Sequence, residues 1–173
     1  MRTTKSALAA LAVGLGLAAC GSSKAPGIVT APSAGATQAS VPTTPKPPPQ
    51  LANKPTVPVP SGPAPTKLVT KDLIPGTGQP AAAGQTITVN YVGVLFKGGT
   101  QFDSSWQKNT PFTTPLSPGS VIPGWVQGLS GMKVGGRREL IIPPSLAYGA
   151  TGRPPTIPPN STLVFVVDLL SVA

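Results

Sequence analysis

The chain has 173 residues, with thirteen lysines and arginines against four acidic residues, no histidine and one cysteine. The absence of histidine excludes hydrolases that use a Ser-His-Asp or Cys-His pair, and one cysteine allows neither an internal disulfide nor a cysteine-rich zinc site. The cations are scattered singly apart from Arg137-Arg138, which favours weak attraction to anionic lipid head groups over a nucleic-acid-binding face.

Residues 1–19 are typical of a secretory signal peptide. Two cations in residues 1–5 precede a small and apolar run at 7–17, which is shorter than the ~20 residues of a membrane-spanning helix. The sequence LAAC that ends at Cys20 resembles the lipobox of bacterial lipoproteins, which implies cleavage before Cys20 and acylation of its sulfur. Two or three acyl chains give stable anchoring. We therefore expect export and a lipid anchor on the extracytoplasmic face of a bacterial membrane; the alternative is an ordinary cleavage site beside a chance cysteine.

Residues 20–65 have the composition of a tether. Twelve of the 24 prolines fall here, and no aromatic residue does. Such a segment cannot bury enough apolar surface to offset the entropy of ordering it, so we expect a disordered, proline-rich linker with polyproline II tendency. A flexible chain of this length spans ~40 Å and an extended proline helix ~140 Å. The run TPKPPP at 44–49 is either a recognition motif or, more simply, part of the spacer.

Residues 66–173 contain every aromatic residue and are enough for an independent core. Alternating apolar residues and turn signals predict strands at 67–70, 85–96, 101–103, 137–142 and 162–170, the second and third of which form a hairpin. One short helix is predicted at 123–129, because its first residue is a proline and a missing N–H is harmless there. The fold class is therefore α+β, with a curled antiparallel β-sheet wrapped over one short helix.

Six motifs in this region resemble those of the FKBP-type prolyl isomerases and occur in the same order. They are NYVG (90–93), FDSS (102–105), VIPGW (121–125), GLSGMKVG (128–135), YGATG (148–152) and IPPNSTLVF (157–165). The resemblance covers essentially all of residues 66–173. It implies an FKBP-like fold and peptidyl-prolyl cis-trans isomerase activity, without a cofactor or a metal.

The resemblance also implies a site. The prolyl ring of the substrate would lie on the indole of Trp125, with Asp103 near the substrate carbonyl and the Tyr148 hydroxyl donating to the ligand. The backbone N–H of Ile122 would hold the following carbonyl. The expected catalytic residues are Asp103, Tyr148, Trp125 and Phe165, and the expected substrate-binding residues are Tyr91, Phe102, Phe112, Val121, Ile122 and Ile157.

These residue types suit the reaction. Rotation about the peptide C–N bond has a barrier of roughly 18–20 kcal/mol because resonance gives the bond double-bond character. No bond is made or broken, so the catalyst needs only to stabilise the twisted amide. An aromatic, water-poor pocket that orients the carbonyl does so without a nucleophile.

Some residues depart from the family pattern. Lys108 stands where many relatives carry arginine. The planar guanidinium of arginine can bind a carboxylate through two parallel hydrogen bonds, whereas the ammonium of lysine cannot. Ser120 occupies a position that is often acidic, and Arg153 and Thr156 replace bulkier loop residues. These departures leave open the affinity for macrolides such as tacrolimus or rapamycin and the preference for the residue before proline.

Each predicted site residue also has a purely structural interpretation, and the protein has competing candidate functions. The aromatic residues could be ordinary core, and Asp103 a turn residue. The competing functions are a non-catalytic binding module or chaperone for proline-containing segments on a lipid anchor, and a structural lipoprotein with a vestigial pocket. The presence of all five of the residues Tyr91, Phe102, Asp103, Trp125 and Tyr148 favours an isomerase that acts on X-Pro bonds of exported proteins. We expect it to act as a monomer and without nucleic acid.

Overall fold

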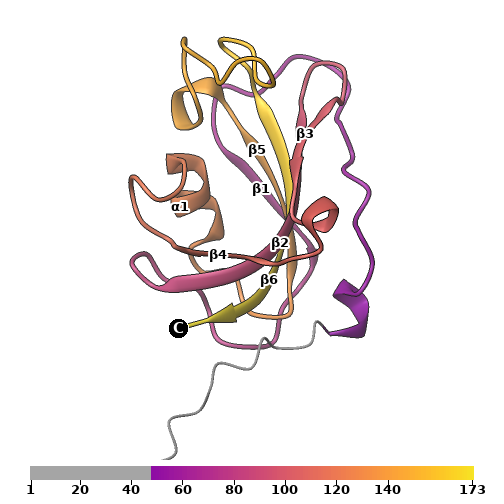
Figure 1. The fold of residues 1–173 in the computed structure, drawn as a ribbon, viewed down its shortest axis with the longest axis vertical. Coiled ribbons are helices and arrows are strands. Elements are labelled where there is room, and N and C mark those ends of the chain that lie inside the picture. Colours follow the sequence, from indigo (N-terminus) through magenta and orange to yellow (C-terminus); the bar gives the residue numbers. More distant parts are fainter. Residues whose placement is uncertain (1–47) are drawn as a thin grey trace, which may run out of the picture. The chain divides into compact units, whose positions relative to one another are not determined.

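The computed structural model of the protein describes residues 48–173, so the predicted signal peptide, Cys20 and most of the predicted tether lie outside the described residues. The described part is a six-stranded antiparallel sheet with one α-helix against one face (Figure 1). The strands are β1 (Val69–Ile74), β2 (Thr86–Leu95), β3 (Gln101–Ser104), β4 (Phe112–Pro115), β5 (Arg137–Ile142) and β6 (Leu163–Val172), and the helix is α1 (Pro123–Leu129). The predicted fold class is confirmed.

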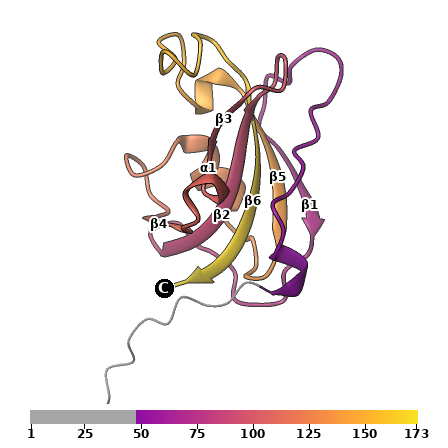
Figure 2. The same cartoon turned by 45° about the vertical axis from the view of Figure 1, so that its right-hand side comes forward.

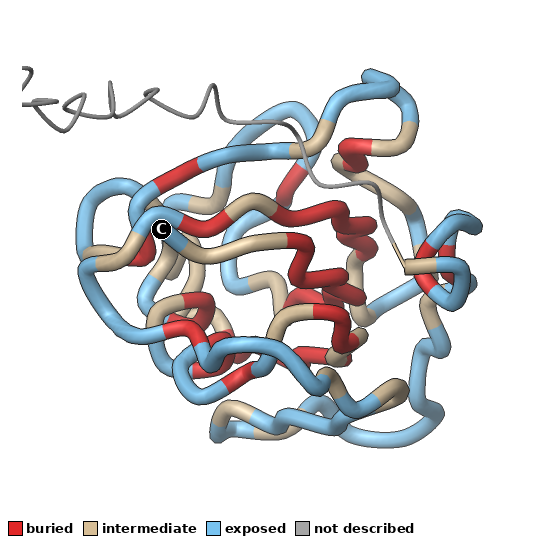
Figure 3. Tube along the Cα trace, turned by 90° about the horizontal axis from the view of Figure 1, so that it is seen from below, coloured by how far each residue is buried: buried red, intermediate tan, exposed pale blue. Residues whose placement is uncertain are grey.

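The sheet order β1-β5-β6-β2-β3 places the two ten-residue strands, β2 and β6, at the centre. Side chains alternate between the two faces of a strand. Ile87, Val89 and Tyr91 of β2 therefore belong to the main core, which α1 covers, whereas Val92 and Val94 belong to a second apolar cluster. Most residues of β2 and β6 are buried, and Figure 3 shows that buried residues gather in the interior of the described part.

The edge of β2 is shared by two short strands. β3 pairs with residues 92–94 and β4 with residues 86–89, and the chain between them forms a 3₁₀ turn at Trp106–Lys108. The Ser105 hydroxyl bridges the gap, because it accepts the N–H of Tyr91 at 2.9 Å and donates to Asn90 Oδ1 at 3.1 Å. The sequence did not predict β4, which has four residues and no alternating apolar pattern.

The helix occupies the predicted residues. It begins with Pro123, and its buried face includes Gly124 and Gly128. A Cβ on Gly124 would come within 3.0 Å of the Ile142 side chain, and one on Gly128 would lie 2.7 Å from Leu140 Cδ2. These two glycines let α1 lie close against β5 and so fix the position of Trp125 over the sheet.

Residues 48–65 differ from the prediction of a disordered tether up to residue 65. They run along the face of the sheet opposite α1 and include a 3₁₀ turn at Pro49–Leu51 (Figures 1 and 2). Leu51 is 0% exposed, Val57 packs against the second cluster, and Gln50 Nε2 donates to the Gly135 carbonyl at 3.2 Å. The composition was misleading because the apolar surface that orders this segment is supplied by the sheet. Residues 48–65 therefore pack against the sheet, although they belong to the segment predicted as a tether.

Among residues 48–173, no helix combines the length and apolar character required to cross a membrane.

Candidate active site

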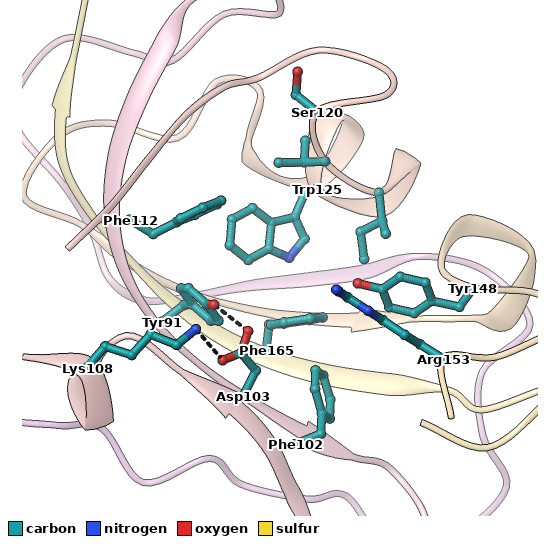
Figure 4. A pocket seen from close by; sticks show the side chains of 12 residues that line it. Tyr91, Phe102, Asp103, Lys108, Phe112, Ser120, Trp125, Tyr148, Arg153 and Phe165 are labelled. Atoms are coloured by element: carbon teal, nitrogen blue, oxygen red, sulfur yellow. Dashed lines mark hydrogen bonds and ion pairs between the residues drawn. The ribbon is translucent and has the colours of Figure 1, made fainter. Parts of the chain in front are cut away.

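A cavity of about 260 Å³ opens between the N-terminal end of α1 and the sheet (Figure 4). It is lined by Tyr91, Phe102, Asp103, Lys108, Phe112, Ser120, Val121, Ile122, Trp125, Tyr148, Arg153 and Phe165. These residues come from β2, β3, the 3₁₀ turn after β3, β4, the loop before α1, α1 itself, the loop before β6, and β6. The cavity therefore exists only because the sheet curls around the helix.

The floor and walls of the cavity are aromatic. The ring centroids of Tyr91 and Trp125 are 5.4 Å apart at 82°, and those of Trp125 and Phe165 are 5.4 Å apart at 84°. Phe102 meets Phe165 in the same edge-to-face manner, and Phe112 contacts Tyr91. Aromatic pairs prefer such arrangements to face-to-face stacking. The rings thus hold one another in place and leave the face of the Trp125 indole as an apolar surface for a ligand.

Trp125 is 4% exposed, and its indole N–H has no hydrogen-bond partner within residues 48–173. A buried donor without a partner costs about 1–3 kcal/mol.

Asp103 forms the polar part of the cavity. Its carboxylate accepts the Tyr91 hydroxyl at 2.6 Å, the Lys108 ammonium at 2.9 Å and the backbone N–H of Ser104 at 2.9 Å. Partial burial acts to raise the pKa of Asp103, but the hydrogen bonds from Tyr91 and Lys108 outweigh it and hold this pKa below its ordinary value. Burial, followed by the hydrogen bond to Asp103, raises the pKa of Tyr91. Both groups keep fixed protonation states near neutral pH, so the pair can orient a substrate but does not exchange protons.

The outer rim is formed by the loop between β5 and β6. The Tyr148 hydroxyl points into the cavity, and the Arg153 guanidinium lies beside it (Figure 4). The same two residues, with Phe102, Asp103 and the loop 154–157, line an adjoining cavity of about 350 Å³. Ile157 is 2% exposed and lines this second cavity, together with Phe102, Asp103 and Tyr148, but not the first.

Every other residue predicted for the site lines the first cavity: Tyr91, Phe102, Asp103, Phe112, Val121, Ile122, Trp125, Tyr148 and Phe165. Their individual roles remain predictions. Lys108, which the sequence suggested as the partner of Asp103, makes that ion pair at 2.9 Å. Two residues with positioning roles were missed: Ser105, and Gly93, whose Cβ would lie 2.7 Å from Phe102 Cζ and 2.8 Å from Phe165 Cε1. Gly93 ends the NYVG motif and Ser105 ends the FDSS motif, so membership of these motifs was the sequence feature that could have identified both residues.

Comparison with known proteins decides the family. The profile of the FKBP-type peptidyl-prolyl cis-trans isomerases matches residues 77–170. The chain belongs to this family. It is 53% identical over 120 residues to an FK506-binding protein of Streptomyces anulatus, a match that covers 69% of this chain and 97% of that one. An FK506-binding protein of Neisseria meningitidis serogroup A is 49% identical over 105 residues, which are 61% of this chain and 95% of the relative.

Two solved structures resemble part of the chain. AtFKBP13 is similar with a TM-score of 0.58 and 40% identity, over 64% of this chain and 96% of that one. FkpA from Escherichia coli is similar with a TM-score of 0.57 and 47% identity, over 62% of this chain and 48% of the FkpA chain. The match with FkpA therefore spans about half of that protein.

The cavity suits the isomerase chemistry of an FKBP-type domain. Bond rotation needs an apolar surface for the prolyl ring and fixed polar groups for the adjacent carbonyl, and the aromatic floor and the Tyr91–Asp103–Lys108 cluster provide both. Within residues 48–173, no group of three or more histidine, cysteine or acidic side chains is placed to hold a metal ion.

Proposed function

We propose that this FKBP-type isomerase accelerates the cis-trans rotation of X-Pro bonds in exported polypeptides, while a lipid on Cys20 anchors it to the outer side of the bacterial cell membrane. Uncatalysed rotation takes tens to hundreds of seconds and limits the folding of many proline-containing chains. The observation that carries the catalytic part is the cavity in which Tyr91, Trp125 and Phe165 surround an apolar space beside the Asp103 carboxylate.

In the proposed mechanism the prolyl ring of the substrate lies against Trp125. The planar amide is polarised, and it gains more from water than the twisted amide, in which resonance is lost. A water-poor aromatic cavity therefore favours the twisted form, while the Tyr148 hydroxyl orients a substrate carbonyl. The Asp103 carboxylate accepts a hydrogen bond from the Tyr91 hydroxyl at 2.6 Å and so holds the Tyr91 ring. It also supplies negative potential near the carbon of the substrate carbonyl.

The cavity is also proposed to bind tacrolimus, known as FK506. This proposal is supported by the relatives from Streptomyces anulatus and Neisseria meningitidis, which are FK506-binding proteins at about 50% identity. Lys108 in place of arginine leaves Asp103 with a point-like partner that is 63% exposed. We therefore expect weaker binding than in relatives whose acidic residue is held by a guanidinium.

The site of action is proposed from the sequence. The signal-like residues 1–19 and the LAAC sequence at Cys20 support export and lipidation. A single acyl chain binds a membrane only reversibly, so two or three chains on Cys20 would be needed for stable anchoring.

The catalytic proposal is tested with the whole chain and a short Xaa-Pro-Phe peptide, whose trans form is selectively cleaved by a protease. We expect acceleration that is lost in Trp125→Ala. The matched control is Trp106→Ala, because Trp106 packs against the second apolar cluster and does not line the cavity. Circular dichroism would establish that both variants are folded. A folded wild-type chain that gives no acceleration would leave a proline-binding module as the function.

The anchor is tested by expressing the chain and a Cys20→Ser variant in bacteria fed radiolabelled palmitate. The proposal expects label and membrane sedimentation in the wild type and neither in the variant. Equal labelling of the two, or a wild-type chain that stays unlabelled in the soluble fraction, would contradict it.

A further inference from the structure

Arg153 places a positive charge at the rim that two adjoining cavities share. Its side chain lines both the cavity that contains Trp125 and the adjoining cavity of about 350 Å³ that contains Ile157. Figure 4 shows the guanidinium next to Tyr148, directed toward the centre of the cavity. A residue next to a proline that lies on Trp125 would therefore pass close to it.

Arg153 forms an ion pair with none of the four acidic residues of the chain. Asp72, Asp103 and Asp168 form ion pairs with Arg138, Lys108 and Arg137. The fourth, Glu139, is buried in β5 and pairs in register with Lys71 of β1.

Within residues 48–173 the Arg153 side chain takes part in no hydrogen bond or ion pair. Lys108, the other cation at the cavity, already pairs with Asp103 at 2.9 Å. The rim of the cavity therefore carries one positive charge without a partner.

The backbone around Arg153 is held firmly. Its N–H donates to the Ile157 carbonyl at 2.8 Å, and the N–H of Ile157 donates to the Arg153 carbonyl at 3.0 Å. Gly152 precedes it with a φ of +65°, and a Cβ there would lie 2.5 Å from the Ile157 carbonyl oxygen, so only glycine fits. The loop thus fixes the origin of the Arg153 side chain while the exposed guanidinium can adjust to a ligand.

We propose that Arg153 is a specificity-determining residue that favours X-Pro segments with an aspartate or glutamate next to the proline. This inference rests on the proposed function and names its substrate class. A carboxylate matches the planar donor geometry of a guanidinium, with two parallel hydrogen bonds. A lysine at the same substrate position would be repelled.

The test compares peptides that differ only in glutamate, glutamine or lysine immediately before the proline, and a second set with the same residues immediately after it. Isomerisation by the whole chain is measured without a protease, by magnetisation exchange between the cis and trans signals in NMR. We expect kcat/KM for glutamate to exceed that for glutamine by about threefold at low salt in one of the two sets, the size of an exposed ion pair. The ratio should approach one in ~1 M salt, where the screening length is about 3 Å.

The variants separate charge from structure. Arg153→Gln should remove the preference for glutamate, Arg153→Lys should retain part of it, and Arg153→Glu should favour the lysine peptide. Lys133→Gln is the matched control, since it also removes one exposed positive charge but lies in the turn before β5 and lines neither cavity. It should keep the wild-type ratio. Equal rates for glutamate and glutamine at both positions, or a ratio that Arg153→Gln leaves unchanged, would overturn the inference.

Peptide binding, followed by tryptophan fluorescence, distinguishes this inference from the proposed function. A glutamate preference in affinity that Arg153→Gln abolishes would support the role of Arg153 even if no peptide were isomerised. Normal isomerisation of a leucine-proline reference peptide without any glutamate preference would overturn the role of Arg153 and leave the isomerase intact.

Discussion

At the scale of single residues, Asp103 shows how the site uses a carboxylate without proton transfer. Three donors converge on it, from Tyr91, Lys108 and the backbone of Ser104, and they hold its pKa below the ordinary value of 3.8. A group with a lowered pKa stabilises the folded state above its ordinary pKa and loses that contribution as the pH falls through the lowered value. The stabilising form is therefore the one present at neutral pH.

The lowered pKa of Asp103 predicts how the free energy of unfolding changes at acidic pH. The free energy of unfolding of wild-type protein should decrease more steeply than that of Asp103→Asn as the pH falls below about 4. The amide keeps an oxygen acceptor but has no charge to titrate. Urea unfolding at a series of pH values measures the difference, and parallel acid limbs for the two proteins would contradict it.

Gly93 affects the site because it has no Cβ, which lets the rings of Phe102 and Phe165 lie close to its backbone. Because a Cβ there would come within 3.0 Å of both Phe102 and Phe165, we expect Gly93→Ala to push these rings into the cavity. Overpacking of this kind costs about 1–3 kcal/mol of stability, and we expect a loss of roughly tenfold in kcat/KM, equivalent to about 1.4 kcal/mol.

The control for Gly93→Ala is Thr86→Ala, an exposed position of the same strand. Thr86→Ala should change neither the free energy of unfolding nor kcat/KM appreciably. A fully active Gly93→Ala variant would show that the rings can move aside without narrowing the cavity.

At the scale of elements, two neighbouring arginines of β5 link different parts of the fold. Arg137 donates to both carboxylate oxygens of Asp168, at 2.5 and 2.8 Å, and to the Asn53 carbonyl at 2.9 Å. Arg138 holds Asp72 on β1 with two similar bonds and also donates to the Gly128 carbonyl of α1. Asp168 is 0% exposed, whereas the Asp72 side chain is 47% exposed.

This difference in burial predicts a difference in stability. Arg137→Gln would leave Asp168 buried without a counter-charge, and removal of one partner of a buried pair costs about 3–5 kcal/mol. Arg138→Gln would break a partly exposed pair, which is worth about 1 kcal/mol or less. Urea unfolding of the two variants tests the prediction, and equal losses would show that burial of Asp168 does not govern its pair.

At the scale of the whole molecule, residues 48–65 cover the face of the sheet that α1 leaves open. Leu51 and Pro55 are buried there, and Val57 contacts the second apolar cluster, while none of these residues lines the candidate active site. We infer that this segment belongs to the folded domain and stabilises it without contacting the substrate.

Leu51→Ala in the whole chain tests that inference. It should lower the free energy of unfolding by about 2–5 kcal/mol, as other buried leucine truncations do, with kcat/KM unchanged. Val59→Ala is the control, because Val59 is 37% exposed in the same segment. A Leu51→Ala variant as stable as the wild type would indicate that residues 48–65 are part of the tether and not of the folded domain.

Sequence patterns alone determined the helix at Pro123–Leu129, the central strands and most of the cavity lining, because periodicity and the family motifs report which residues face a core. They did not predict β4, whose pairing is supplied by β2, or the order of residues 48–65, whose apolar partner is the sheet. Composition measures only the apolar surface that a segment carries itself. The position of Ile157 outside the main cavity and the unpaired charge of Arg153 depend on distances between distant segments, so only the tertiary structure decided them.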